Sequence, residues 1–341
     1  MFSLTTMKDI ALEAGVSVMT VSNVINNKTD TVSQKTIDAV NSIIKKLDYT
    51  PNMLARSLVL NSSRVVAYIN TIGFGLGDPF NAAFIDSLER SLSKKGYYLM
   101  IKTINHPNDL KNFLKNRNVD GMVFMGIFDR EMVKIVSESN IPTVLIDSYF
   151  KCRNTVNIGL DDERSAFNAC EYLIKRGHRK IAVTTQSSFK IGVNKARLAG
   201  FKKAMNKHNI PIRREFLFDT CNTSEKTISI DEHLAKSDIT AVLSFSDVTA
   251  IEIMRGITKS RKQIPEDISV LGFDDIDLYL LTTPQLSTIH QDTYNKGQIA
   301  VEQLIRLLSG QKCTGTIILP THIIERESVK SLALNVIFFC A

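Results

Sequence analysis

The sequence predicts a small all-helical unit at the N-terminus, followed by a larger α/β core built as two lobes around parallel sheets. Residues from about 5 to 50 read as short helices without a strand pattern. From Arg64 onward, apolar runs rich in β-branched residues alternate with amphipathic stretches of helix length. This alternation indicates βαβ units and sheets buried on both faces. About eleven or twelve such runs are too many for one compact sheet, so two similar lobes are expected.

The N-terminal unit is predicted to contain three helices. Thr6 and Asp9 have the spacing of a helix-start cap, and Gly15 stands where that helix must end and turn. Ser17 is suited to cap a second helix running to about Asn26, and Ser33 a third. The spacing of small and branched residues lets the first two helices cross closely, as in a helix-turn-helix.

The second helix carries short hydrogen-bonding side chains on the face that we expect to be exposed. Side chains of this kind contact base edges and phosphates in the major groove. A docking or dimerisation module is the alternative interpretation of three such helices. The polar set is Thr20, Ser22, Asn23, Asn26, Asn27 and Lys28.

A junction follows at residues 51–61. Pro51 stops the preceding helix, and Asn52 is a good N-cap for another one of only two turns. A helix so short is marginal in water, so a plain linker is the alternative.

The strands of the core are predicted from continuous apolar runs. Between them lie stretches long enough for helices, which is typical of parallel sheets. The clearest runs are residues 65–69, 121–125, 143–146, 181–183, 241–243 and 268–273.

Net charge and cysteine content limit the kinds of partner and site that we expect. The chain of 341 residues has a net charge of +7, but the first 64 residues hold only seven basic against five acidic side chains. Charge therefore permits a polyanionic partner without locating it. The five cysteines are scattered, and we expect neither a disulfide framework nor a zinc site.

The N-terminus has no charged region followed by an apolar stretch, so no secretory leader is predicted. The apolar tail at residues 332–341 is too short to span a bilayer and is interpreted as a last strand or a frayed end. These features indicate a soluble protein of the reducing cytoplasm without a membrane partner.

Motifs for catalysis or cofactor binding are not found. The glycines between Gly73 and Gly77 lack dinucleotide-binding spacing, and a loop lining a cleft is the preferred interpretation. The six histidines show no metal-ligand spacing, and no nucleophile and base can be paired. We therefore expect no enzyme activity, no cofactor and no metal.

The N-terminal segments resemble the head-piece of the lac repressor/galactose repressor (LacI/GalR) family of bacterial transcriptional regulators. The resemblance lies in Thr6–Asn26 (TMKDIALEAGVSVMTVSNVIN), Val32–Thr36 (VSQKT) and Leu47–Asn52 (LDYTPN). It implies that residues 1–50 form a helix-turn-helix DNA-binding domain with Ser17 to Asn26 as its recognition helix. It also implies that residues 51–61 form the family's hinge helix.

The resemblance further implies which residues meet DNA. Val18 and Met19 stand where the family sets operator choice, and Leu58 stands where an apolar wedge kinks the duplex. Asn23 replaces the usual arginine. Asparagine favours adenine, whereas arginine favours guanine, so the resemblance suggests a different operator sequence. The implied DNA-binding residues are Thr6, Ser17, Val18, Met19, Thr20, Ser22, Asn23, Asn26, Asn27, Asn52, Ala55, Arg56 and Leu58.

From residue 62 onward the chain resembles the family's effector-binding core, which has a two-lobed, periplasmic-binding-protein-like fold. The resemblance implies an N-lobe of about residues 62–161 and 292–321, and a C-lobe of about 162–291 and 322–341. The matching stretches are Asp78–Phe80 (DPF), Asn118–Met122 (NVDGM), Ile141–Asp147 (IPTVLID), Arg176–Ala182 (RGHRKIA), Arg197–Phe201 (RLAGF), Ile264–Asp275 (IPEDISVLGFDD) and Leu319–Pro320 (LP).

Effector-binding residues follow from the same resemblance. Carboxylates and a guanidinium can hydrogen-bond several groups of a small polar molecule. Asp247 and Asp274 have the alternative of capping the helices that follow them. Residues 219–226 contain no aromatic and the chain contains no tryptophan, which weighs against a stacked sugar ring. The implied set is Phe80, Asp147, Arg197, Ser246, Asp247 and Asp274, with Ser246 in place of a frequent asparagine.

The sequence thus leads to a DNA-binding transcriptional regulator, a homodimeric repressor controlled by a small metabolite. Its operator would be near-palindromic double-stranded DNA. A solute-binding receptor without DNA function is the alternative, and an enzyme on an open α/β scaffold is a third. We expect the metabolite to be a sugar or a sugar derivative, although the family resemblance also allows sugar phosphates and purines.

Overall fold

The computed structural model describes residues 5–25, 28–49, 62–71, 75–116, 119–148, 150, 155–219, 234 and 237–332. The chain divides into two compact units, residues 1–63 and 64–341. The predicted hinge and the C-terminal tail from residue 333 lie outside the described residues.

The first unit consists of α1 (Met7–Ala14), α2 (Val18–Ile25) and α3 (Gln34–Lys46). Thr6 and Asp9 cap α1 reciprocally, and the Gly15 that ends it has φ 63°, a left-handed conformation that glycine adopts freely. The hydroxyl of Ser17 accepts a hydrogen bond from the amide of Thr20 at 3.0 Å, and that of Ser33 caps α3. The helices and caps predicted from local spacing are therefore confirmed.

A small apolar core holds these three helices together. Ile10, Val21 and Val40 contribute one fully buried side chain from each helix. Ala11 lies in the same core, and its small side chain is compatible with a close approach of α1 and α2. Val18 is 43% exposed, because its position in α2 faces away from this core.

The first lobe of the core unit is built on a six-stranded sheet with strand order β11-β5-β4-β3-β1-β2. All of its strand pairs are parallel. The strands are β1 (Val65–Asn70), β2 (Tyr98–Thr103), β3 (Gly121–Met125), β4 (Thr143–Ile146), β5 (Thr155–Leu160) and β11 (Gly315–Leu319).

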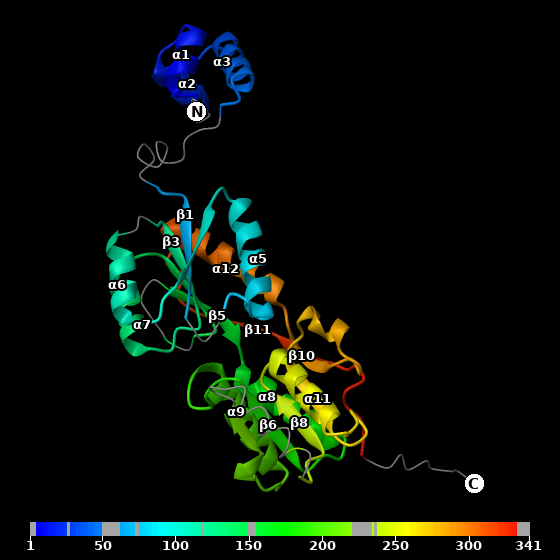
Figure 1. Ribbon diagram of the computed structural model, residues 1–341. Helices are drawn as coiled ribbons and strands as arrows, with labels where there is room; N and C mark the ends of the chain where they lie inside the picture. The colour runs from blue at the N-terminus through cyan, green and yellow to red at the C-terminus, as the bar shows by residue number, and fades with distance from the viewer. Residues whose placement is uncertain are drawn as a thin grey trace, which may run out of the picture. The chain divides into compact units, whose positions relative to one another are not determined.

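Helices cover both faces of this sheet, as continuous apolar strands require. Alternate residues of β1 serve the two faces: Val66 and Tyr68 join one core cluster, and Ala67 and Ile69 join the other. Helices α5 and α12 pack together, as do α6 and α7 (Figure 1). Their bounds are α5 (Pro79–Ser93), α6 (Pro107–Asn116), α7 (Arg130–Glu138) and α12 (Thr293–Leu308).

The second lobe repeats this plan around a sheet of strand order β12-β10-β9-β8-β6-β7. Its pairs are parallel except for β10 with β12, which is antiparallel. The strands are β6 (Ile181–Thr185), β7 (Leu217–Asp219), β8 (Ala241–Ser244), β9 (Ser269–Asp274), β10 (Ser287–Gln291) and β12 (Thr321–Ile324). The helices are α8 (Asp162–Lys175), α9 (Gly192–Lys207), α11 (Asp247–Lys259) and the 3-10 segments η1 (Arg214–Phe216) and η2 (Asp277–Leu281).

The chain passes between the lobes three times. It crosses from β5 to α8, returns from β10 to α12, and crosses again from β11 to β12. The hydroxyls of Ser165 and Thr321 lie 2.8 Å apart and join two of these crossings. The predicted fold class is confirmed, and each sheet is completed by a strand from a late part of the chain.

Candidate functional sites

The N-terminal end of α2 presents an exposed surface in the first unit. Met19 is 70% exposed and Val18 is 43% exposed, directly after the Ser17 cap. Thr6 and Ser17 are exposed, whereas Thr20, Ser22 and Asn23 are only partly exposed. The predicted contacts Asn26, Asn27, Asn52, Ala55, Arg56 and Leu58 lie outside the described residues.

Charge does not mark this surface. Residues 5–49 contain five lysines and five acidic residues. One of these lysines, Lys46, pairs with Glu13 at 2.6 Å. The described residues of this unit therefore carry no net excess of positive charge.

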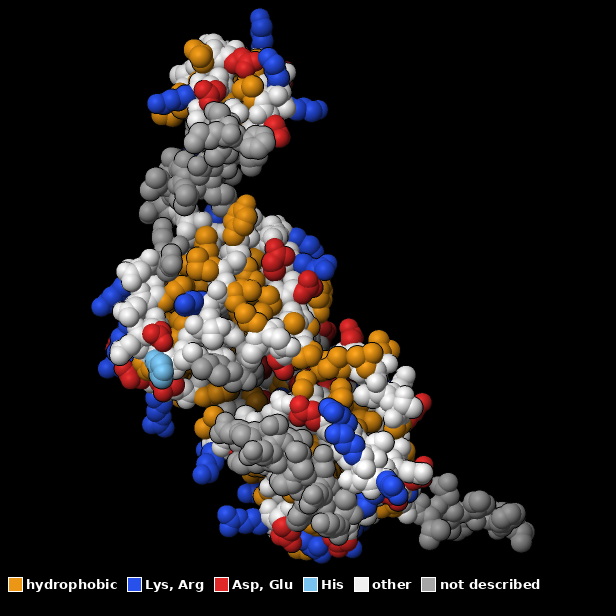
Figure 2. Space-filling view, in the orientation of Figure 1, with side chains coloured by type: hydrophobic (Ala, Val, Ile, Leu, Met, Phe, Trp, Pro, Cys, Tyr) orange, Lys and Arg blue, Asp and Glu red, His pale blue; other side chains and the backbone are white. Residues whose placement is uncertain are grey.

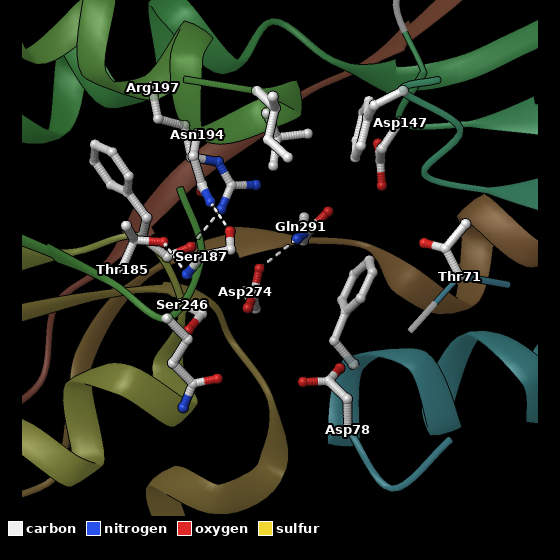
Figure 3. Close-up of a pocket in the computed structure, with 16 residues that line it drawn as sticks. Thr71, Asp78, Asp147, Thr185, Ser187, Asn194, Arg197, Ser246, Asp274 and Gln291 are labelled. Carbon is white, nitrogen blue, oxygen red and sulfur yellow. Dashed lines mark hydrogen bonds between the residues drawn. The ribbon is translucent and has the colours of Figure 1, made fainter. Parts of the chain in front are cut away.

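The core unit contains a cavity of about 500 Å³ between its two lobes (Figure 3). Both lobes contribute apolar walls and polar groups, which is the usual composition of a small-molecule site. It is lined by Thr71, Asp78, Phe80, Phe128 and Asp147 from the first lobe, by Thr185, Gln186, Ser187, Ile191, Val193, Asn194, Arg197, Phe245, Ser246 and Asp274 from the second, and by Gln291 at a crossing.

Five of the six predicted effector residues line this cavity, and Asp247 does not. Its buried carboxylate accepts hydrogen bonds from the Thr288 hydroxyl at 2.6 Å and from the Ile276 amide at 3.0 Å. Asp247 therefore holds β10 and the segment after β9 together instead of lining the cavity. The alternative role as a helix cap also fails, because the hydroxyl of Ser246 caps α11.

A chain of buried polar groups connects the lobes along the cavity. Lys296 donates to both carboxylate oxygens of Asp147, at 3.0 and 2.9 Å, and to the side-chain carbonyl of Gln291 at 2.9 Å. Gln291 in turn donates to Asp274 at 2.6 Å. Sequence reasoning missed Lys296 and Gln291, because a lysine in an amphipathic helix ordinarily faces solvent.

Arg197 is held in a second buried network. Its Nε donates to Asp162 at 2.7 Å, its Nη1 donates to the Phe245 carbonyl, and its guanidinium lies 3.5 Å from the centre of the Phe273 ring. The side chain is thus oriented before any ligand arrives. Asp162 was not predicted, because its position at the start of α8 reads as an ordinary acidic first turn.

The pKa of the Asp274 carboxyl is raised by its surroundings. Burial raises its pKa well above the ordinary value, and the nearby charges of Asp247 and Asp78 raise it further, whereas Arg197 and the Gln291 hydrogen bond lower it. In Figure 3 the carboxylate of Asp274 is directed toward Gln291, its hydrogen-bond partner. Asp274 ends β9 with φ 124° and Asp147 follows β4 with φ 51°, so both use left-handed backbone.

The two lobes also touch directly beside the cavity. A Cβ added at Gly192 would lie 2.6 Å from the Phe128 ring, and Gly192 itself has φ 56°. Gly192 begins α9 in the second lobe, and Phe128 follows β3 in the first. Only glycine allows this approach together with this backbone conformation.

Metal binding and membrane insertion find no support in the described part of the chain. It contains no group of three or more His, Cys, Asp or Glu side chains placed to hold a metal ion. None of its helices is long and apolar enough to cross a bilayer.

Comparisons with known proteins agree with both units. The family "Bacterial regulatory proteins, lacI family" matches residues 6–52, and "Periplasmic binding protein-like domain" matches residues 170–329. The HTH-type transcriptional repressor PurR of Actinobacillus pleuropneumoniae serotype 3 is 31% identical, with 96% of this chain and 99% of that protein covered. The ribose operon repressor of Haemophilus influenzae is 32% identical, with 96% and 100% covered.

Solved structures extend the similarity to three dimensions. The lac repressor dimer bound to operator and an anti-inducer is 25% identical, with 96% of this chain and 100% of that chain covered and a TM-score of 0.83. The complex of the transcriptional regulator CelR with cellobiose is also 25% identical, with 95% and 99% covered and a TM-score of 0.70.

Proposed function

The chain belongs to the lacI family of bacterial regulatory proteins, and on this premise we propose that it is a cytoplasmic, homodimeric repressor that a small metabolite controls. It is a transcription regulator and not an enzyme. In this proposal residues 1–50 bind the operator, residues 51–61 form a hinge helix on DNA, and residues 62–341 bind the effector and the partner subunit. The proposed lobes are residues 62–161 with 292–321, and residues 162–291 with 322–341.

The observation that carries the DNA-binding part is the surface at the start of α2. Met19 and Val18 project into solvent from the capped end of α2, which lies within the segment that matches the lacI family. Contact with thymine methyl groups in the major groove would use such side chains. Two copies related by a two-fold axis would read two half-sites of a near-palindrome.

The operator is identified by selection from a library of randomised duplex DNA with the full-length chain. We expect a near-palindromic consensus, and we expect Met19→Ala to weaken binding to it at least about tenfold, the value of one good base contact. Leu12→Ala is the matched control, since Leu12 is 86% exposed on α1 and is not among the predicted contacts. Equal losses in both variants would contradict the assignment of α2.

The hinge assignment is tested by Leu58→Ser. If Leu58 wedges between base steps, the variant binds the operator more weakly while its effector affinity is unchanged. Unchanged operator affinity would refute the role of Leu58 as a wedge.

Asn23→Arg tests the base preference of the recognition helix, because arginine favours guanine where asparagine favours adenine.

Effector control follows from the lobes that enclose the cavity. Closing or rotating them changes the spacing of the two hinges in a dimer and so changes operator affinity. The coupling is reciprocal, so the operator must change effector affinity by the same factor. Calorimetric titration of the effector with and without operator DNA checks this equality.

The dimer has candidate surfaces in both lobes. Tyr98 and Ile101 are exposed on the edge strand β2, and Leu280 and Leu281 are 64% and 81% exposed in η2. Figure 2 shows apolar side chains on the visible face of both lobes. Analytical ultracentrifugation of Leu281→Lys should show dissociation if η2 belongs to the subunit interface.

A solute-binding receptor without DNA function is the second candidate. The core fold alone would serve either role. Selection that returns no DNA consensus, together with tight binding of a metabolite, would favour the receptor.

A further inference from the structure

The charges around the cavity indicate the chemical class of the effector. Among the described residues, Arg197 lines the cavity and Lys296 contacts the lining residues Asp147 and Gln291, and both cations are already paired. Lys296 is fully buried against both oxygens of Asp147, and Arg197 is paired with the buried carboxylate of Asp162. An anionic ligand would have to compete with these carboxylates for the same cations.

Two further carboxyl groups face the cavity from opposite lobes. Asp78 is at the start of α5 in the first lobe, and Asp274 is at the end of β9 in the second. They are close enough for the charge of Asp78 to raise the pKa of Asp274. Among the described lining residues, the charged side chains are thus Asp78, Asp147, Asp274 and Arg197.

The remaining lining of the described cavity is uncharged. Hydroxyl and amide groups such as Thr185, Asn194 and Ser246 lie beside the rings of Phe80, Phe128 and Phe245. A volume of about 500 Å³ is sufficient for a molecule of the size of a disaccharide or a nucleoside. Such a site offers a ligand hydrogen bonds and apolar contacts, while the aspartates of its lining make the electrostatic potential unfavourable for an anion.

We propose that the cavity takes an uncharged or cationic polar metabolite and discriminates against phosphorylated and carboxylated ones, with Asp78 and Asp274 setting this preference. The inference rests on the proposed effector control and narrows it. Like charges forced together in a desolvated site are strongly unfavourable, so an anion loses at least about tenfold in affinity relative to its uncharged counterpart.

The test uses matched probes on the full-length chain. Thermal-shift screening and calorimetric titration compare glucose, cellobiose and glucosamine with glucose 6-phosphate and glucuronate, and hypoxanthine and inosine with inosine monophosphate. The expected binders carry no net negative charge. An anionic probe that binds as tightly as its uncharged counterpart overturns the proposal, and so does a panel in which no uncharged or cationic probe raises the melting temperature.

Asp274→Asn and Asp78→Asn test the two residues separately. Each keeps the size of the side chain and removes its ionisable carboxyl group, and asparagine can still cap α5 at position 78. Each variant should reduce the difference in affinity between an uncharged probe and its phosphorylated counterpart. Asp277→Asn is the control, because this exposed aspartate in η2 lies outside the cavity lining and its loss should leave this difference unchanged.

Two measurements keep the variants and the proposals distinguishable. Circular dichroism establishes that each variant is folded, and Asp78→Asn tests the preference even if Asp274→Asn does not fold. If neither folded variant reduces this difference in affinity, the two carboxyl groups do not set the preference against anionic ligands. An anionic effector that changes operator affinity would leave the repressor function intact and overturn only the charge preference.

Discussion

The amino group of Lys296 lies 3.0 and 2.9 Å from the two carboxylate oxygens of Asp147, and the lysine side chain is fully buried. Both residues belong to the first lobe, but Lys296 also binds Gln291 at the crossing from the second lobe. This ion pair therefore joins the residue after β4 to α12 and fixes one end of the hydrogen-bonded chain that leads to Asp274.

Lys296→Met should destabilise the core by about 3–5 kcal/mol, because it leaves the carboxylate of Asp147 buried without a counter-ion. The double variant Asp147→Asn with Lys296→Met should recover part of this loss. Urea denaturation measures both free energies of unfolding.

The matched control is Lys203→Met, which breaks an exposed ion pair with Glu163. Exposed pairs contribute at most about 1 kcal/mol. Similar losses at positions 296 and 203 would contradict a special role for burial.

Gly200→Ala should destabilise the second lobe although alanine is the better helix former. A Cβ at Gly200 would lie 1.9 Å from the carbonyl oxygen of Glu163 and 2.9 Å from the amide nitrogen of Phe167. Helices α8 and α9 would have to separate, which costs about 1–3 kcal/mol or more. The melting temperature checks this, with Lys202→Ala on the exposed face of α9 as the control. A stabilised Gly200→Ala protein would show that the helices separate without cost.

Asp247→Asn should alter the pH dependence of stability. Burial raises the pKa of Asp247 from 3.8 to about 6. The folded state then binds more protons than the unfolded state between these values, so wild-type stability falls as the pH rises from about 4 to about 6. The variant should gain up to about 3 kcal/mol relative to wild type across this window. Urea denaturation at pH 4 and pH 7 measures the gain, and a difference independent of pH would refute it.

His178→Gln should also alter the pH dependence of stability, with an effect opposite in sign to that of Asp247→Asn. Burial lowers the pKa of His178 below 6.5, and its ring nitrogens meet the Thr240 hydroxyl and the Lys330 carbonyl, both at 3.1 Å. The unfolded state then binds more protons, so wild-type stability falls as the pH drops below about 6.5. Urea denaturation between pH 7.5 and pH 5 should show a smaller loss for the variant. An equal loss would mean that His178 does not titrate in this window.

Local signals predicted the first unit well. The caps at Thr6 and Ser17 and the turn at Gly15 are set by neighbours within a few residues, so periodicity and residue type suffice to find them. The strands of the core were equally visible, because a strand buried on both faces must be apolar throughout.

The cavity was predictable only in part. The resemblance led to Asp147, Arg197 and Asp274, but it also led to Asp247, whose neighbour in space is Thr288 from another strand. Lys296 and Asp162 were not predicted as site residues, because their partners are 149 and 35 residues away in the sequence. No local pattern records such distances.

The sequence by itself determined the family, the helix-turn-helix and the two-lobed α/β core, because these depend on local propensity, hydrophobic periodicity and matched motifs. Tertiary structure alone decided which carboxylates line the cavity and which are enclosed by other parts of the protein. A carboxylate in a buried site must find a partner, and whether that partner is a lysine, a hydroxyl or a ligand depends on chain segments brought together from distant positions. Asp247 and Asp274 end next to the same strand, β10, yet only Asp274 is at the cavity.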